Sequence, residues 1–176
     1  ITSMDADHLD IYENKSSLND AFEEFAMKVN PANGKLYIKN GLKLAKAKID
    51  GFYDVAVNTD NYADNLRIVD SRYVVDYIGK MAEIKNLETG IPGRVNIENA
   101  VAAITMALAA GMTPEEIRSA LSRFKGVWRR FNTHVSNSCC MYIDDYAHHP
   151  KEIEATLVSI REMWPDRKLV VLFQPH

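Results

Sequence analysis

A chain of 176 residues, of which 47% are hydrophobic and 26% charged, has the composition of a soluble globular protein and can bury a sizeable core in one or two domains. Its net charge of −3 gives no support for a general nucleic-acid or membrane surface, and no apolar run approaches the roughly 18 residues of a membrane-spanning helix. The two cysteines, Cys139 and Cys140, are adjacent on a predicted strand, so we expect neither a disulfide between them nor a metal site, and we expect a reducing, cytoplasmic environment.

The first ten residues join an apolar start to an acidic cluster. Residues 1–4 are predicted to end a strand, and the acidic segment 5–10, which contains His8, follows directly. Carboxylates and an imidazole after a strand can bind a divalent cation, although a solvated acidic loop fits the same spacing. Because the chain begins with Ile rather than Met, and because a strong β run, Leu169–Phe173, lies close to its other end, we expect it to be a piece of a longer protein.

The next stretch is predicted to contain one helix followed by strands. Apolar residues at helical spacing predict a helix that begins near Ser16 or Ser17 and ends before Pro31. The predicted strands are Leu36–Ile38, Phe52–Asn58, Leu66–Ile78 and Met81–Leu87, the last two joined as a hairpin at Gly79-Lys80.

A Pro92-Gly93 turn leads into a predicted helix, Ala100–Ala110, that is almost wholly apolar and should be buried. Asn96 and Asn99 are three residues apart, so they share one face at the start of this helix. Their amides could cap the helix, or they could bind a ligand such as the edge of an adenine ring through paired donors and acceptors. Both interpretations fit the spacing.

A second helix start precedes a basic segment. Thr113-Pro114-Glu115-Glu116 forms a capping box with proline at the first helical position. Four cations follow the helix and could bind a phosphate or carboxylate, or form a solvated basic turn: Arg123, Lys125, Arg129 and Arg130. Residues 132–138 are polar and without periodicity, and they are interpreted as the linker between two domains.

The segment richest in reactive side chains follows a short apolar run, Met141–Ile143. Two carboxylates, an aromatic ring and two imidazoles come next, in the order Asp144-Asp145-Tyr146-Ala147-His148-His149, and Pro150 opens a helical pattern. Strand, polar loop and helix is the order in which an open α/β sheet builds a binding site at the carboxyl end of a strand. In the alternative interpretation, one of the aspartates only caps the helix and the histidines are solvated.

Five segments of the chain occur in the order found in the Mur ligases of bacterial cell-wall synthesis, which the chain resembles over essentially its whole length. They are Ala6–Asp10, Pro92–Ala100, Phe124–Phe131, Asp144–Pro150 and Phe173–His176. The resemblance implies an α/β fold in which the C-terminal part of a central ATP-binding domain, 1–131, precedes the beginning of a Rossmann-like C-terminal domain, 132–176. It also implies an N-terminal UDP-binding domain and the remainder of the C-terminal domain in the same polypeptide.

The resemblance further implies an enzyme that uses ATP and Mg²⁺ to form an amide bond. It is strongest with the members that join L-alanine to UDP-N-acetylmuramate, in which ATP phosphorylates the muramate carboxylate and the amine attacks the acyl phosphate. On the same basis, His8 would bind magnesium, and His8, Arg130 and Asp145 would act in catalysis. The implied ATP-binding residues are Asn96, Asn99, Arg130 and Asp145, and the implied substrate-binding residues are Tyr146, His148 and His176.

The sequence departs from the family pattern in two places. It contains no G-x-x-x-x-G-K-[ST] phosphate-binding loop, so we expect this loop upstream of Ile1 and expect the chain alone to be inactive, and Val95 stands where many relatives have histidine. Three alternatives remain open. These are a relative that attaches a recycled tripeptide to UDP-N-acetylmuramate, a metal-dependent hydrolase in which His8, Asp145 and His148 converge on one ion, and a noncatalytic binding domain.

Overall fold

The computed structural model describes residues 1–5, 14–56, 58–70 and 72–174. Within these ranges the helices are α1 (Lys15–Met27), α2 (Arg94–Ala109), α3 (Pro114–Arg123) and α4 (Pro150–Met163), and a short 3-10 turn, η1 (Asn30–Ala32), follows α1. The strands are β1 (Tyr37–Lys39), β2 (Gly51–Asp54), β3 (Asn61–Val69), β4 (Arg72–Gly79), β5 (Glu83–Glu88), β6 (Asn132–Ser136) and β7 (Met141–Asp144).

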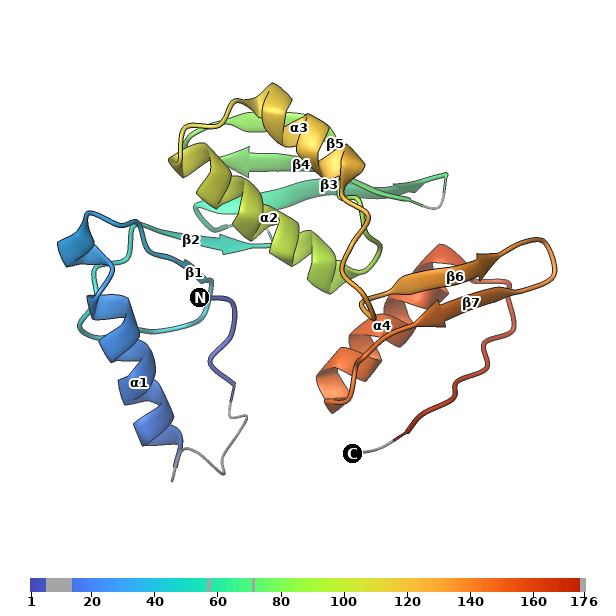
Figure 1. The fold of residues 1–176 in the computed structure, drawn as a ribbon. Helices are drawn as coiled ribbons and strands as arrows, with labels where there is room; N and C mark the ends of the chain where they lie inside the picture. Colours follow the sequence, from blue (N-terminus) through green and yellow to red (C-terminus); the bar gives the residue numbers. More distant parts are fainter. Residues whose placement is uncertain (6–13, 57, 71, 175–176) are drawn as a thin grey trace.

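A mixed sheet with the strand order β1-β2-β3-β4-β5 forms the centre of the molecule (Figure 1). Strands β1, β2 and β3 run parallel, whereas β3, β4 and β5 pair in antiparallel fashion. The hairpin predicted at Gly79-Lys80 is confirmed. The single strand predicted at Leu66–Ile78 is wrong, because the chain reverses after Val69 and Asp70 adopts a φ of +49°. The sequence did not indicate this turn, because the residues on both sides of it favour β structure.

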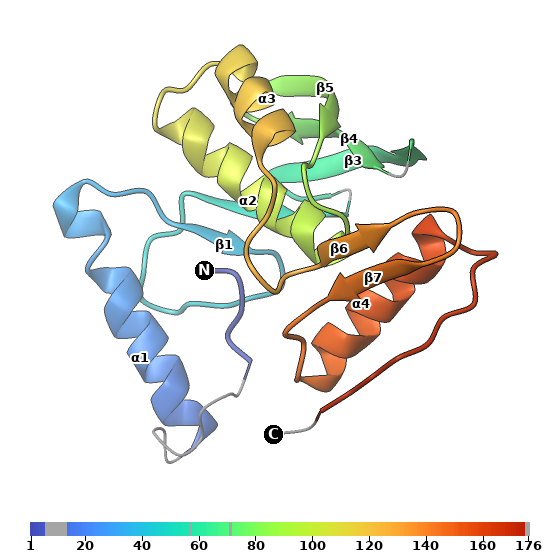
Figure 2. The same ribbon diagram turned by 45° about the vertical axis from the view of Figure 1, so that its right-hand side comes forward.

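Helix α2 lies across one face of this sheet, and α3 lies beside it over β5 (Figures 1 and 2). The face of α2 that carries Ile97, Val101 and Ile104 is fully buried in one apolar cluster with sheet residues such as Tyr77 and Leu87. Each such side chain stabilises the fold by about 1.5–3 kcal/mol relative to exposure. This packing anchors the helix whose amino end carries the predicted ligand-binding asparagines.

The start and burial of α2 differ from the prediction. The helix begins at Arg94 rather than near Ala100, so Asn96 and Asn99 lie inside its first two turns. Its burial is confirmed on the sheet-facing side only, because Met106 is 61% exposed on the other side. The capping box at the start of α3 is confirmed, with the Thr113 hydroxyl accepting from the backbone N–H of Glu116.

Helix α1 belongs to a second apolar cluster, in which Ala26 packs with Leu36 and Ile38 at the β1 edge of the sheet. The helix begins slightly before its predicted start, because Asn14 is the N-cap and accepts a hydrogen bond from the Ser17 N–H at 3.0 Å. The predicted strand at Leu36–Ile38 is confirmed one residue later as β1, and the one at Phe52–Asn58 is confirmed in shorter form as β2.

The last part of the chain forms a β6–β7 hairpin packed on α4 (Figure 2). Phe131 at its start and Met163 at the end of α4 are buried in the same apolar cluster as α2 and the central sheet. The start of α4 at Pro150 and the strand after Cys140 are confirmed. The hairpin and α4, which flank the site loop, therefore share a core with the central sheet.

Three predictions for this part are wrong. Residues 132–138 are not a linker, since most of them form β6, whose largely exposed side chains carry no burial pattern to detect. The two cysteines precede β7 in a turn, where the side chain of Asn137 accepts hydrogen bonds from both of their N–H groups. Leu169–Phe173 is largely exposed and does not pair with a strand among the described residues. High β propensity does not form a strand unless the edge of another strand is available for pairing.

Candidate functional site

The amino end of α2 is the first part of the predicted site that the structure describes. Gly93 is the N-cap, with a φ of +106° that favours glycine, and glycine supplies no capping side chain. Asn96 donates from its amide nitrogen to the carbonyl of Pro92, so it holds the turn before the helix rather than capping the helical amides. Asn99 is exposed on the next turn, where its amide can offer both a donor and an acceptor to a ligand.

Asp145 connects the loop after β7 to the segment that enters β6. Its carboxylate accepts a hydrogen bond from the backbone N–H of Phe131 at 2.8 Å and another from that of Ala147 at 2.8 Å. Phe131 is only 4% exposed and stacks on Trp164, so the carboxylate fixes the loop to a core residue. The interpretation in which an aspartate caps α4 is wrong, because the N-cap is His149.

Tyr146 contacts the basic segment. Its backbone N–H donates to the carbonyl of Arg129 at 2.8 Å, and the Arg129 guanidinium lies 4.8 Å from the centroid of its ring, within the range of a cation–π interaction. Asp144 lies 3.9 Å from the Arg129 guanidinium and 3.8 Å from the ring of His134. The structure thus places Tyr146, a predicted substrate-binding residue, against Arg129 near the end of the basic segment.

Arg130 faces the first turn of α4. Its guanidinium lies 3.3 Å from one carboxylate oxygen of Glu152, and the other oxygen accepts from the N–H of His148 at 3.4 Å. Sequence reasoning assigned no role to Glu152, although its spacing of four residues from His148 could have suggested the contact. Arg123 instead bonds back to the Ser119 carbonyl within α3. The four cations therefore do not form one cluster: Arg130 shares Glu152 with His148, whereas Arg129 lies over the ring of Tyr146.

The beginning of the chain reaches the same turn. Asp5, the first residue of the acidic segment 5–10, forms an ion pair with Lys151 of α4 at 3.3 Å. The rest of that segment, with His8, lies outside the described residues, and so does His176. Among the side chains that the structure describes, no group of three or more His, Cys, Asp or Glu residues could hold a metal ion.

A polar network joins α4 to the central sheet and was missed in the sequence. Glu162 accepts from the Tyr73 hydroxyl at 2.8 Å and from the Arg94 guanidinium at 2.9 Å. The hydroxyl of Ser159 lies 3.3 Å from the Arg94 N–H and accepts from it. No local pattern could reveal these contacts, since Tyr73 and Glu162 are 89 residues apart in the chain.

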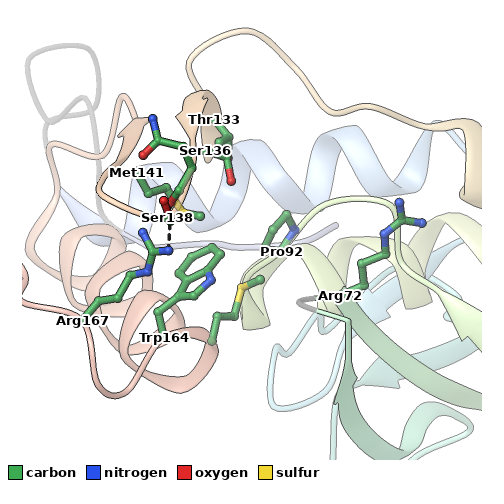
Figure 3. Close-up of a pocket in the computed structure, with 10 residues that line it drawn as sticks. Arg72, Pro92, Thr133, Ser136, Ser138, Met141, Trp164 and Arg167 are labelled. Carbon is green, nitrogen blue, oxygen red and sulfur yellow. Dashed lines mark hydrogen bonds between the residues drawn. The ribbon is translucent and has the colours of Figure 1, made fainter.

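A cavity of about 650 Å³ opens at the same junction, beside Pro92 and Trp164 (Figure 3). Arg72 and Arg167 contribute the two charges among its lining side chains, and the Arg167 guanidinium donates to the carbonyl of Asn137. The described residues of the predicted site lie elsewhere. The cavity is therefore separate from the loop that carries Asp145 and His148.

Comparison with known protein families assigns both parts of the chain. Residues 1–107 match the model of the Mur ligase middle domain, and residues 129–176 match that of the Mur ligase glutamate ligase domain. The chain belongs to the Mur ligase family. The α/β fold and the family inferred from the sequence are confirmed.

The chain resembles curated Mur ligases that are named UDP-N-acetylmuramate–L-alanine ligases. One from Christiangramia forsetii is 47% identical over 176 residues, which is all of this chain and 38% of that protein. One from Parabacteroides distasonis is 39% identical over 180 aligned residues, again covering all of this chain and 39% of that protein. The chain thus spans well under half the length of these relatives.

Solved structures agree at the level of the fold. The crystal structure of a UDP-N-acetylmuramate–alanine ligase, MurC, from Thermotoga maritima superposes with a TM-score of 0.82 and 26% identity, over 99% of this chain and 41% of that one. A MurF structure from Acinetobacter baumannii has a TM-score of 0.70 at 17% identity over 94% of this chain and 36% of that one, a likeness of fold alone. Of the helices described in this Mur ligase chain, none has the length and apolar character needed to cross a membrane.

Proposed function

We propose that this chain is part of a longer ATP-dependent ligase that joins L-alanine to UDP-N-acetylmuramate. The observation that carries the proposal is the 47% identity to a ligase of that name over every residue of the chain. The geometry is compatible with it, because both parts of the chain carry polar side chains that the family resemblance assigns to the site. Asn99 lies at the start of α2, and Arg130, Asp145, Tyr146 and His148 surround the start of α4.

ATP would supply the phosphoryl group that converts the muramate carboxylate into an acyl phosphate, from which the amine of L-alanine displaces inorganic phosphate as the amide bond forms. The described residues fit such a ligand. The Arg130 guanidinium has five N–H donors, so its contact with Glu152 leaves donors for a phosphate oxygen. Asp145 can likewise accept a further hydrogen bond, because a carboxylate has about four acceptor sites and two backbone amides occupy part of them.

We propose roles for the remaining residues on the same basis. Asn96 and Asn99 would bind the adenine end of ATP, and His8 would ligate Mg²⁺, a hard cation that also takes oxygen ligands from phosphates. Tyr146, His148 and His176 would face the amino acid and the muramate. The contact of Asp5 with Lys151 supports this arrangement, because it brings the first residue of the acidic segment to the first turn of α4, which directly follows His148 and His149.

We further propose a domain boundary between residues 131 and 132, so that the chemistry requires the two domains to meet. The N-terminal UDP-binding domain and the rest of the C-terminal domain would come from the same polypeptide. A cytoplasmic location would fit the two exposed free cysteines and the need for ATP.

The test uses the full-length protein with ATP, Mg²⁺ and UDP-N-acetylmuramate. Phosphate release is measured with L-alanine, L-serine, glycine or the recycled tripeptide as the amine. We expect release to depend on L-alanine and to fall at least tenfold in Arg130→Ala and in His8→Ala. Arg123→Ala is the matched control for Arg130→Ala, because its guanidinium bonds within α3, and its rate should stay within about twofold of wild type.

Each other outcome would contradict the proposal in a different way. Dependence on the tripeptide would assign the protein to peptide recycling. Phosphate release that needs the metal but no amine would favour a hydrolase. Binding of ATP without any release would favour a noncatalytic domain.

A further inference from the structure

The two family-matched parts of the chain are joined by a compact polar network. Tyr73 of β4 and Arg94 of α2 belong to the first part, and Ser159 and Glu162 of α4 belong to the second. A Glu162 oxygen lies 2.7 Å from a terminal nitrogen of Arg94, in addition to the bonds from the Arg94 Nε atom and the Tyr73 hydroxyl. One carboxylate thus binds two elements of the other part at once.

The network joins buried groups to a partly exposed ion pair. Tyr73 is 2% exposed and Ser159 is 1% exposed, whereas the side chains of Glu162 and Arg94 are 28% and 58% exposed. The Arg94 guanidinium lowers the pKa of Glu162, and burial together with the adjacent Glu162 carboxylate raises the pKa of Tyr73. Each direction indicates that the carboxylate is ionised and the phenol neutral when the contact is formed.

The same network reaches the helix end that carries the proposed adenine-binding residues. The first amides of a helix have no partner within it, and Gly93 cannot cap them with a side chain. Ser159 accepts from the Arg94 N–H, so α4 supplies a cap to α2 from the other part of the molecule. A Cβ atom on Gly93 would lie 3.3 Å from the Asn96 amide nitrogen and 3.6 Å from the Ser159 hydroxyl, which shows how closely the two elements approach.

We propose that Tyr73, Arg94, Ser159 and Glu162 form an interdomain latch that holds α4 against the amino end of α2, and that the latch aligns the nucleotide-binding residues of the two domains with each other. The four are positioning residues, since they act through Asn96 and Asn99 in the first domain and through Asp145 in the second. The nucleotide part of this proposal rests on the proposed ATP-dependent activity.

The latch has a defined kinetic consequence. If ATP contacts both domains, its apparent dissociation constant is the intrinsic one divided by the fraction of molecules in the aligned arrangement. Loosening the latch lowers that fraction, so the KM for ATP rises. Saturating ATP restores the alignment, so kcat changes little. A merely structural role would instead lower the amount of active enzyme and leave the KM unchanged.

The first experiment compares Glu162→Gln and Tyr73→Phe in the full-length ligase with Glu154→Gln, which alters an exposed carboxylate of the same helix. We expect the KM for ATP to rise at least fivefold in the first two variants, with kcat within about twofold of wild type, and the control to match wild type. Arg94→Glu and Glu162→Arg should each raise the KM, and the double charge reversal should restore most of it. Failure of the double reversal to improve on either single variant would overturn the latch.

A second readout is independent of turnover. Spin labels at Met106→Cys on α2 and Val158→Cys on α4, both at exposed positions, report the distance between the two elements once native cysteines such as Cys139 and Cys140 are replaced by serine. Glu162→Gln should broaden the distance distribution, and ATP should narrow it again. An unchanged distribution would refute the latch whatever the kinetics. Broadening in a protein that neither binds ATP nor releases phosphate would instead refute the proposed function and the nucleotide part of the latch.

Discussion

Replacing Asp145 by alanine should loosen the loop between β7 and α4 without unfolding the protein. The substitution removes the shared acceptor of the Phe131 and Ala147 amides, each held at 2.8 Å. Hydrogen bonds to a charged group contribute about 1.5–3 kcal/mol each, so two of them sum to about 3 kcal/mol at the lower limit. Asp145 is partly exposed, so water would replace some of the lost hydrogen bonding to the two amides. We therefore expect the free energy of local opening to fall by about 2 kcal/mol.

Hydrogen exchange of the two amides in the full-length protein measures this quantity directly, because exchange through local opening reports the free energy of that opening. A loss of about 2 kcal/mol corresponds to about 30-fold faster exchange. Asp144→Ala is the matched control, because the neighbouring carboxylate has ion-pair contacts at 3.8 Å and 3.9 Å on the protein surface. Such contacts contribute about 0–1 kcal/mol, so the control should speed exchange by less than about fivefold.

Equal exchange rates in the two variants would refute the reasoning, since they would mean that the Asp145 carboxylate holds neither amide in solution. Asp145→Asn adds a finer comparison. The amide side chain keeps one acceptor oxygen and presents donors to the second backbone N–H, so it should retain protection at one amide and lose it at the other.

The remaining predictions concern the scaffold. Thr113→Ala removes the capping box of α3 and should lower the free energy of unfolding by about 1 kcal/mol, seen as a lower urea midpoint; an unchanged midpoint would show that the cap contributes nothing. Tyr77→Phe removes a buried hydroxyl that bonds to Asn61 and Thr105 and should cost about 1–2 kcal/mol in the same assay, whereas loss of an exposed hydroxyl would cost almost nothing. Arg94 lowers the folded-state pKa of Glu162 below the ordinary value of 4.5. The ion pair therefore stabilises the folded protein fully above pH 4.5, and this stabilisation is lost as the pH falls through the folded-state pKa of Glu162. The difference in melting temperature between wild type and Glu162→Gln should therefore shrink below pH 4.5, and a difference that persists unchanged at lower pH would contradict the ion pair.

Local features of the fold could be predicted because short stretches of sequence determine them. The capping box at Thr113 and the start of α4 at Pro150 are examples, since capping side chains and proline act within a few residues. β6 was missed because its largely exposed side chains show no alternation, and its identity as a strand depends on pairing with β7. The exposed run at 169–173 is the opposite case, with strong β propensity and no pairing partner among the described residues.

Some parts of the candidate site could likewise be predicted from the sequence, and others could not. A loop such as 144–149 concentrates reactive residue types in a few positions, so a sequence motif can reveal it. The groups that hold the loop and the start of α2 in place come from distant elements, and Tyr73 and Glu162 are recognisable as partners only after folding. Phe131 lies inside a sequence motif, but its role in holding the loop follows only from the hydrogen bond that its backbone N–H donates to Asp145.

The junction between the two parts combines two kinds of contact with different consequences for alignment. Phe131, Met163 and Trp164 pack into the central core, and such apolar contact is favourable but non-directional, so it resists separation more than rotation. Hydrogen bonds depend steeply on angle, and those of Glu162 reach two different elements of the central domain. The apolar contacts therefore hold the domains together, while the polar latch selects one angle between them. A ligase whose reacting groups come from both domains needs both properties, because a small error in alignment displaces the reacting atoms.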